Sequence, residues 1–269
     1  MALDPARNGP GPGPGYREKP HHSVCYEPTP KRLRATFAGA TVFDTTRALI
    51  LFETNHVPVY YVPRADVADE LLRPTDRVTY CPFKGEASYW TIAAGDRVAE
   101  NAVWGYEHPY DEVPDLDDHV AFYWDRLDHW YEEDEEVFVH ARSPYVRVDI
   151  LPSSRPVQVT LGGVEAARST RAHFLFETGL PVRYYLPRED VRMDLLTPSE
   201  RRTQCPYKGT ASYYSAEIDG TRYDDIVWTY TDPVAESERI RGLLCFFNEK
   251  VDALHVDGVE QAKPVTKWS

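Results

Sequence analysis

The chain has 269 residues, 30 basic and 43 acidic, and its formal net charge is −13. This charge repels polyanions, so the sequence argues against a nucleic-acid partner. The composition, 42% hydrophobic and 27% charged, is typical of a globular protein in water, and no apolar run approaches the ~20 residues of a membrane span. The start has no basic region followed by an apolar core, so we expect no signal peptide, no membrane partner and a cytoplasmic location.

In chain order, composition divides the sequence into five parts. Glycine and proline alternate from Gly9 to Gly15 and form neither helix nor sheet, which predicts a disordered start. An acidic, proline-marked stretch from Tyr131 onward predicts a linker. The expected parts are a tail at 1–30, a first domain at 31–130, the linker at 131–154, a second domain at 155–259 and a tail at 260–269.

Most of each domain has the pattern of β-strands. Gly95-Asp96 and Asp219-Gly220 lie between apolar or alternating runs and predict hairpin turns. Segments 64–72 and 188–196 each follow a proline and are predicted as short helices. The predicted strands of the first domain are 32–37, 41–43, 48–52, 59–62, 87–93 and 97–106. The predicted fold class is therefore mainly β, with short helical turns.

An internal duplication organises the chain. The motif CPFKG at 81–85 returns as CPYKG at 205–209, and TRA at 46–48 returns at 170–172, so the offset is 205 − 81 = 124. Of the 44 positions from Thr46 to Tyr89, 25 are identical to the residue 124 positions later. Copies of about 100 residues have the usual size of a domain, so we expect two tandem copies of one fold. Polar residues present in both copies are the first candidates for a site.

The repeated cysteine and lysine are the catalytic candidates. Cys81 and Cys205 occupy the same place in the two copies, and Lys84 and Lys208 follow three residues later. A nearby cation lowers the pKa of a thiol and activates it as a nucleophile. The other interpretation is a buried or ligand-lining cysteine, because free cysteine is often buried and no histidine is repeated beside it.

Two repeated arginines per copy are candidates for binding an anion, because the guanidinium group binds carboxylate or phosphate in a bidentate way. These are Arg47 and Arg64 in the first copy and Arg171 and Arg188 in the second. The structural alternative is an arginine–carboxylate clamp inside the fold that uses the repeated Glu53 and Glu177 or the repeated Asp66 and Asp190, such as a buried Arg47–Glu53 pair.

Repeated aromatic residues complete the candidate binding set. They pack in a core or line a cleft that stacks on a planar ring or encloses a cation. The residues are Tyr61, Tyr89 and Trp104 in the first copy and Tyr185, Tyr213 and Trp228 in the second.

Several kinds of site find no support in the sequence. The four cysteines form no C-x-x-C pair, which argues against structural zinc, and no other metal site is predicted. No P-loop, dinucleotide-binding, G-x-S-x-G or H-E-x-x-H motif is present, so the sequence identifies no cofactor.

The TRA, YYxPR and CPxKGxASY motifs make both copies similar to the family known as "domain of unknown function 427", over residues 33–128 and 157–252. The resemblance implies a compact fold of the β-tent kind, whose relatives use zinc or a shallow aromatic pocket. The family also carries a nucleotidyltransferase label. Polymerase-type nucleotidyl transfer needs a close carboxylate pair that holds magnesium. The repeated acids near the motif are Glu53, Glu177, Asp66 and Asp190.

Three functional hypotheses follow. The first is a small-molecule site in each repeat that binds an anion through the repeated basic residues and supports group transfer or hydrolysis. The second is a recognition module with an aromatic-lined groove and no catalysis. The third is the nucleotidyl transfer that the family label suggests.

Overall fold

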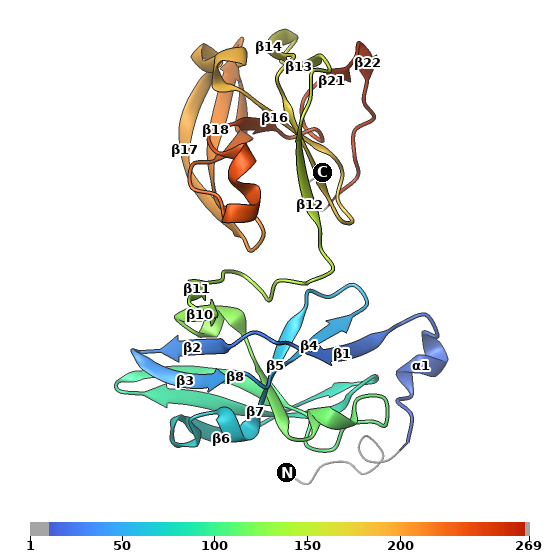
Figure 1. Ribbon diagram of the computed structural model, residues 1–269, viewed down its shortest axis with the longest axis vertical. Helices are drawn as coiled ribbons and strands as arrows, with labels where there is room; N and C mark the ends of the chain where they lie inside the picture. The colour runs from blue at the N-terminus through green and yellow to red at the C-terminus, as the bar shows by residue number, and fades with distance from the viewer. Residues whose placement is uncertain (1–10, 267–269) are drawn as a thin grey trace. The chain divides into compact units, whose positions relative to one another are not determined.

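The computed structural model describes residues 11–266 and confirms the predicted class: the chain is mainly β and forms two tandem domains. Two compact units divide between Arg142 and Ser143. Each unit contains one seven-stranded and one four-stranded antiparallel sheet, with corresponding strand orders in the two units (Figure 1). The 124-residue offset therefore marks a repeated fold.

The larger sheet of the first unit contains, in spatial order, β1 (Val24–Pro28), β4 (Leu49–Glu53), β5 (Val59–Pro63), β9 (His119–Phe122), β8 (Arg97–Gly105), β7 (Gly85–Ala94) and β6 (Leu72–Cys81). Its smaller sheet contains β11 (Glu135–Glu136), β10 (His129–Glu132), β2 (Leu33–Phe37) and β3 (Ala40–Thr45). The helical elements are α1 (Gly15–Glu18) and the 3-10 turns η1 (Arg64–Asp66), η2 (Asp69–Leu71), η3 (Pro114–Leu116) and η4 (Trp124–Arg126).

The larger sheet of the second unit contains β12 (Val148–Pro152), β15 (His173–Glu177), β16 (Arg183–Leu186), β20 (Leu244–Phe246), β19 (Thr221–Tyr230), β18 (Gly209–Ile218) and β17 (Leu196–Cys205). Its smaller sheet contains β14 (Val164–Ser169), β13 (Val157–Leu161), β21 (Ala253–Val256) and β22 (Val259–Glu260). The 3-10 turns are η5 (Arg188–Asp190), η6 (Met193–Leu195) and η7 (Ala235–Ile240).

The larger sheet has apolar side chains on both faces, because successive residues of a strand point in opposite directions. In β4, Ile50 belongs to the core shared with Phe43 of the smaller sheet. Its neighbour Leu51 belongs to a second cluster with Tyr61 and Tyr89. We call the face that carries this second cluster the outer face of the larger sheet. Both predicted hairpins are confirmed, and β7 pairs with β8 as β18 pairs with β19.

The predicted short helices at 64–72 and 188–196 are wrong. Each segment forms two 3-10 turns and then enters a strand. Val67 and Val191 separate the turns in an extended conformation and bridge to the smaller sheet at Phe43 and Ala167. Both valines are 7% exposed, so a tertiary contact of a β-branched residue overrides the local helical pattern.

The expected tail and linker contribute to the sheets. Residues 1–10 lie outside the described part of the chain, but β1 pairs with β4 along five residues. Within the expected linker, β10 and β11 complete the first unit, and β12 begins the second. Composition missed these strands because a sheet edge supplies hydrogen bonds to residues of any type. Between residues 11 and 266, no helix has the length and apolar character needed to cross a membrane.

Candidate functional site

A nearly buried ion pair lies at one end of the outer face in the first repeat. Glu53 is the last residue of β4, and Lys84 lies in the turn between β6 and β7. The Lys84 ammonium donates a hydrogen bond to the Glu53 carboxylate, and their side chains are 7% and 10% exposed. Burial raises the pKa of Glu53, but the charge and hydrogen bond of Lys84, with a further contact from His22, hold it below its ordinary value. The Glu53 carboxylate is therefore ionised at neutral pH.

The second repeat forms the corresponding ion pair between Lys208 and Glu177, and the sequence did not predict this pairing in either repeat. Lys208 Nζ lies 2.5 Å from Glu177 Oε2, and the side chains are 11% and 8% exposed. The turn that carries the lysine is the same in both copies: Lys84 N and Lys208 N each donate to the carbonyl of the cysteine three residues earlier, at 3.3 Å. The CPxKG motif thus positions cysteine and lysine on one tight turn beside a carboxylate.

Tyrosine and tryptophan lie next to this pair on the outer face. Trp104 Nε1 donates to the Tyr61 hydroxyl at 3.3 Å, and Trp228 Nε1 donates to the Tyr185 hydroxyl at 2.9 Å. Burial raises the pKa of Tyr61, and the negative charges of Glu53 and Cys81 add to this effect. Cys81 packs against the apolar cluster that contains Tyr61, and Glu53 is bound to Lys84 on the same turn as Cys81, so these groups lie together.

In the second repeat, burial raises the pKa of Tyr185, the counterpart of Tyr61, well above its ordinary value, and the charge of Glu177 adds to this effect. Burial also raises the pKa of Tyr230, and Cys205 and Glu177, when ionised, add to this effect. Both repeated cysteines are partly exposed, whereas Cys245 is fully buried. We call the set of repeated lysine, glutamate, cysteine and tyrosine the Lys–Glu–Cys cluster of each repeat: Glu53, Tyr61, Cys81 and Lys84, and Glu177, Tyr185, Cys205 and Lys208.

The repeated Tyr89 and Tyr213 lie further along the same face. Their hydroxyl groups are hydrogen-bonded to Thr79 at 2.8 Å and to Thr203 at 2.6 Å. The guanidinium of Arg77 lies over the Tyr89 ring at 4.6 Å. Sequence reasoning missed Arg77 and its counterpart Arg201, although the identity of the two arginines at the 124-residue offset was a signal that could have found them.

The structure places Arg47 and Arg171 away from the Lys–Glu–Cys cluster. Arg47 donates to both carboxylate oxygens of Asp66, at 2.5 and 3.2 Å, and its side chain is 62% exposed. Arg171 donates to Asp190 at 2.7 Å and to Glu189 at 3.2 Å. Of the two pairings considered for this arginine, the one with Asp66 forms, at the surface, and the Arg47–Glu53 pairing is wrong. Arg47 precedes β4 and Glu53 is its last residue, so six residues of extended chain separate them by about 20 Å.

Arg64 and Arg188 also lie elsewhere. Arg64 pairs with Asp69 and lies 5.7 Å from the centre of the Trp90 ring. Arg188 donates to the Tyr214 hydroxyl at 3.1 Å. Trp90 and Tyr214 each follow an outer-face tyrosine in the strand and therefore point to the opposite face. The structure thus brings cysteine, lysine, glutamate, tyrosine and tryptophan together and separates the arginines from them.

The acids considered for nucleotidyl transfer do not form a pair, because each is bound to a different basic residue. Glu53 pairs with Lys84, whereas Asp66 accepts from Thr45 at 2.6 Å and from Arg47. Among the residues that the structure describes, no group of three or more histidine, cysteine, aspartate or glutamate side chains is arranged to hold a metal ion.

An N-terminal strap, residues 11–22, covers the cluster of the first repeat. Gly15 N donates to the carbonyl of Pro82 at 2.9 Å, and the Tyr16 ring meets the Phe83 ring edge-on at 5.0 Å. The His22 ring stacks on Phe83 at 3.7 Å, and its Nε2 lies 3.0 Å from Glu53 Oε1. A Cβ at Gly15 would lie 2.7 Å from the Phe83 ring, so only glycine permits this approach.

The Tyr16 hydroxyl points into the covered region. It is buried and has no hydrogen-bond partner among residues 11–266. Burial, with the charges of Glu112, Cys81 and Glu53, raises its pKa to about 12. The positions 124 residues after the strap are 135–146, and of these 135–142 belong to the first compact unit. In the second unit, Ser143 N donates to the hydroxyl of Tyr207, the counterpart of Phe83, at 2.8 Å. The corresponding residues in the second unit are therefore limited to 143–146.

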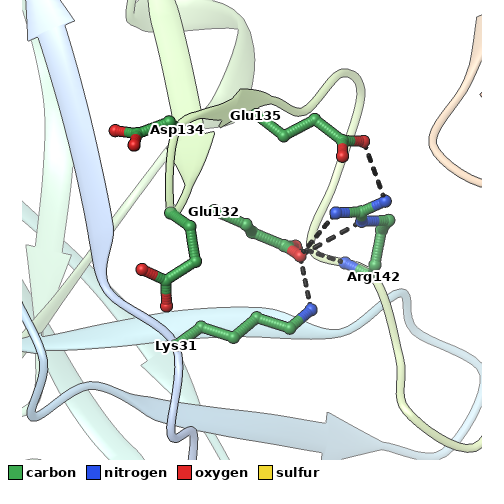
Figure 2. Close-up of a pocket in the computed structure, with 6 residues that line it drawn as sticks. Lys31, Glu132, Asp134, Glu135 and Arg142 are labelled. Carbon is green, nitrogen blue, oxygen red and sulfur yellow. Dashed lines mark hydrogen bonds and ion pairs between the residues drawn. The ribbon is translucent and has the colours of Figure 1, made fainter.

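The acidic stretch that follows Tyr131 contributes to a separate polar group, which Figure 2 shows. A hollow of about 550 Å³ is lined by Lys31, Glu132, Glu133, Asp134, Glu135 and Arg142. Glu132 is 3% exposed and accepts from the Tyr60 hydroxyl at 2.8 Å, from Arg142 Nε at 3.1 Å and from the Lys31 ammonium. Its charge is thus neutralised internally, which identifies a structural clamp between the two ends of the first unit.

Comparison with known proteins identifies the family. None of the curated proteins matches this sequence significantly. The family model described as "Domain of unknown function (DUF427)" matches twice, at residues 25–133 and 149–257. Each match lies within one of the two units and extends from its first strand in the larger sheet to β10 or β21 of the smaller one. The chain therefore belongs to this family of domains of unknown function and contains two copies of the domain.

Proposed function

We propose that each repeat binds a small molecule with an anionic group at its Lys–Glu–Cys cluster. The observation that carries this proposal is the ion pair itself. It forms in both repeats, at the same place, with side chains no more than 11% exposed. Removing two charges from water costs as much as or more than their attraction returns, so a buried pair adds little net stability. A binding role accounts for its presence in both copies.

The geometry suits an anion because the carboxylate holds the ammonium in place. A lysine ammonium has three N–H donors, and Glu177 takes one of those of Lys208. The remaining donors, together with the tyrosine hydroxyls of the outer face, are the groups that an incoming carboxylate or phosphate oxygen needs. In a poorly hydrated site, such a fixed cation binds an anion more strongly than a mobile surface lysine does.

The cysteine extends the proposal from binding to group transfer or hydrolysis. The thiolate of Cys205 would form a bond to an electrophilic atom of the substrate while the leaving group departs with its electron pair. Lys208 would stabilise the negative charge that develops on the substrate oxygen. A thiol with this role needs a reducing compartment, so the proposal places the protein in the cytoplasm.

Two alkylating probes that differ in charge test the anion site at the thiol. Iodoacetate and iodoacetamide react with the same thiolate, so the ratio of their rate constants at Cys205 measures attraction of an anion. In a Glu177→Gln background, adding Lys208→Met should lower this ratio about fivefold, which corresponds to ~1 kcal/mol of Coulomb attraction. Cys25, which is exposed, serves as the control, and its ratio should not change.

The proposal fails if the ratio at Cys205 is the same in both variants. It also fails if Cys205 reacts with neither reagent until the protein unfolds, because a ligand could then not reach the cluster. Site-resolved mass spectrometry of the alkylated chain measures all four cysteines in one experiment.

Recognition without catalysis is the second candidate. It is favoured by the edge-on Tyr–Trp pairs of both repeats, with ring centres 6.4 Å apart for Tyr61–Trp104 and 6.2 Å apart for Tyr185–Trp228. A binding residue needs no activated thiol. This candidate therefore predicts that Cys205 reacts with iodoacetamide no faster than Cys25.

A further inference from the structure

The outer face of the first repeat also carries an exposed aromatic pair that the Lys–Glu–Cys cluster does not include. The rings of Trp104 and Tyr123 lie 4.7 Å apart, tilted by 46°. Tyr123 follows β9 and is 36% exposed, and Trp104 in β8 is half-buried. Large aromatic rings at the surface are available for stacking with a planar ligand.

Two arginines flank this aromatic pair. Arg126 lies in η4, the turn that follows Tyr123, and its backbone N donates to the Tyr123 carbonyl at 3.1 Å. Arg77 lies in β6, which pairs with β7, and β7 pairs with the strand β8 that carries Trp104. Both arginines are exposed, and within residues 11–266 neither forms an ion pair. Arg77 is held over the face of Tyr89 at 4.6 Å. In a chain with a net charge of −13, two cations without carboxylate partners beside one aromatic pair need an explanation.

In the second repeat, a carboxylate of the protein itself binds the corresponding arginine. Arg201, the counterpart of Arg77, pairs with Asp225 at 3.3 Å. Asn101 occupies the position of Asp225 in the first repeat, where its amide oxygen accepts from Thr75 at 2.8 Å instead. The first repeat therefore lacks the carboxylate that neutralises this arginine in the second.

The aromatic pair of the second repeat is also more enclosed. Trp228 and Phe247 lie 4.5 Å apart but are 8% and 9% exposed. Arg183 lies 5.5 Å from the centre of the Trp228 ring and is held there by two hydrogen bonds to Glu249, at 2.8 and 2.6 Å. Val59 stands in the first repeat where the second has Arg183, so Trp104 has no such cover.

We infer that the first repeat binds a small aromatic anion, such as an aryl phosphate or aryl carboxylate, on the surface formed by Arg77, Trp104, Tyr123 and Arg126. The aromatic ring of the ligand stacks against Trp104 and Tyr123. Its anionic group binds the two guanidinium groups, which suit the paired oxygens of phosphate and carboxylate. This site lies outside the Lys–Glu–Cys cluster and belongs to the first repeat alone.

Titration with phenyl phosphate tests the site through the tryptophan indole signals. In protein labelled with ¹⁵N at the tryptophan indoles, the Trp104 signal, assigned with Trp104→Phe, should shift and saturate. The Trp228 signal is the internal control and should stay in place. Inorganic phosphate supplies the anion without the ring, and phenol supplies the ring without the anion. Both should bind at least about tenfold more weakly, because each lacks one of the two interactions.

Substitution of the arginines completes the test. Arg77→Gln and Arg126→Gln change exposed side chains, and unchanged indole signals in the free protein verify the fold. Each should raise the Kd for phenyl phosphate about tenfold, the usual loss for one charged hydrogen bond. The inference is overturned if Trp104 shows no saturable shift, if inorganic phosphate binds as tightly as phenyl phosphate, or if Trp228 shifts equally. The Trp104 signal reports on the first repeat, whereas the alkylation ratio at Cys205 reports on the Lys–Glu–Cys cluster of the second. Either proposal can therefore be refuted while the other is supported.

Discussion

Replacing Lys208 with methionine tests whether the buried ion pair has the energetics on which its proposed role depends. Methionine keeps most of the apolar stem of lysine and removes the charge. Glu177, with its side chain 8% exposed, is then left without the ammonium that neutralises it. We expect the free energy of unfolding of the second unit to fall by about 3–5 kcal/mol, the usual cost of leaving a buried charge unpaired.

The double substitution Lys208→Met/Glu177→Gln removes both charges and with them both the attraction and the desolvation cost. Its expected cost is within about 1 kcal/mol, so the double-mutant cycle should give a coupling energy of at least about 2 kcal/mol. The pair Arg222–Asp224 is the control, because its side chains are 63% and 70% exposed. The cycle of Arg222→Met and Asp224→Asn should give a coupling energy below about 1 kcal/mol.

Urea titration followed through the indole signal of Trp228 measures the unfolding of the second unit. A whole-chain signal would not, because two domains need not unfold in one transition. A coupling energy for Lys208–Glu177 as small as that of the Arg222–Asp224 control would refute the reasoning. It would show that solvent screens the pair, and the argument that it is present for binding would lose its basis.

Three further predictions concern the strap, the clamp and the buried thiol. Gly15→Val places methyl groups against the Phe83 ring and should displace the strap. Iodoacetamide should then alkylate Cys81 faster, as measured by mass spectrometry. An unchanged rate would show that the strap does not protect the thiol. Burial raises the pKa of Glu132, but Lys31, Arg142 and Tyr60 hold it below its ordinary value of 4.5. The ionised carboxylate therefore stabilises the folded first unit fully above about pH 4.5, and this stabilisation is lost as the pH falls through the lower folded-state pKa. Glu132→Val, which copies the residue at this position of the second repeat, should therefore make the urea midpoint of the first unit less dependent on pH below 4.5, and equal dependence would contradict this. Burial, opposed in part by the charge of Arg183, raises the pKa of Cys245 to about 12. This thiol should therefore resist alkylation at pH 8 until urea unfolds the second unit. Alkylation of Cys245 in the native protein would contradict this prediction.

Local sequence patterns correctly predicted the elements whose conformation depends on neighbouring residues in the sequence. The hairpin of β18 and β19 turns at Asp219-Gly220, and both residues have positive φ angles, 48° and 75°. An Asp-Gly pair favours this conformation independently of the rest of the fold. The short helix expected at 64–72 failed for the opposite reason. The contact of Val67 with the smaller sheet lies outside any local window and determines the conformation there.

The candidate site divides in the same way. The duplication selected Cys81 and Lys84 as a pair, and the pair does share one turn. The partner of Lys84 was not predictable, because Glu53 is 31 residues away in sequence and the turn reaches it only through the pairing of strands across the larger sheet. Arg77 was overlooked because its role depends on Tyr89, which lies on the neighbouring strand.

The sequence by itself determined that the protein has two copies of one mainly β domain, because strand periodicity, turn residues and the 124-residue repeat are properties of the linear chain. Only the tertiary structure decided which repeated polar residues meet. Alternation across the sheet separates side chains that are adjacent in sequence onto opposite faces, as it does Tyr89 and Trp90. Strand pairing joins residues that are distant in sequence, such as Glu177 and Lys208. The difference between the two repeats, with a strap over one and an arginine over the tryptophan of the other, also arises from contacts between distant segments.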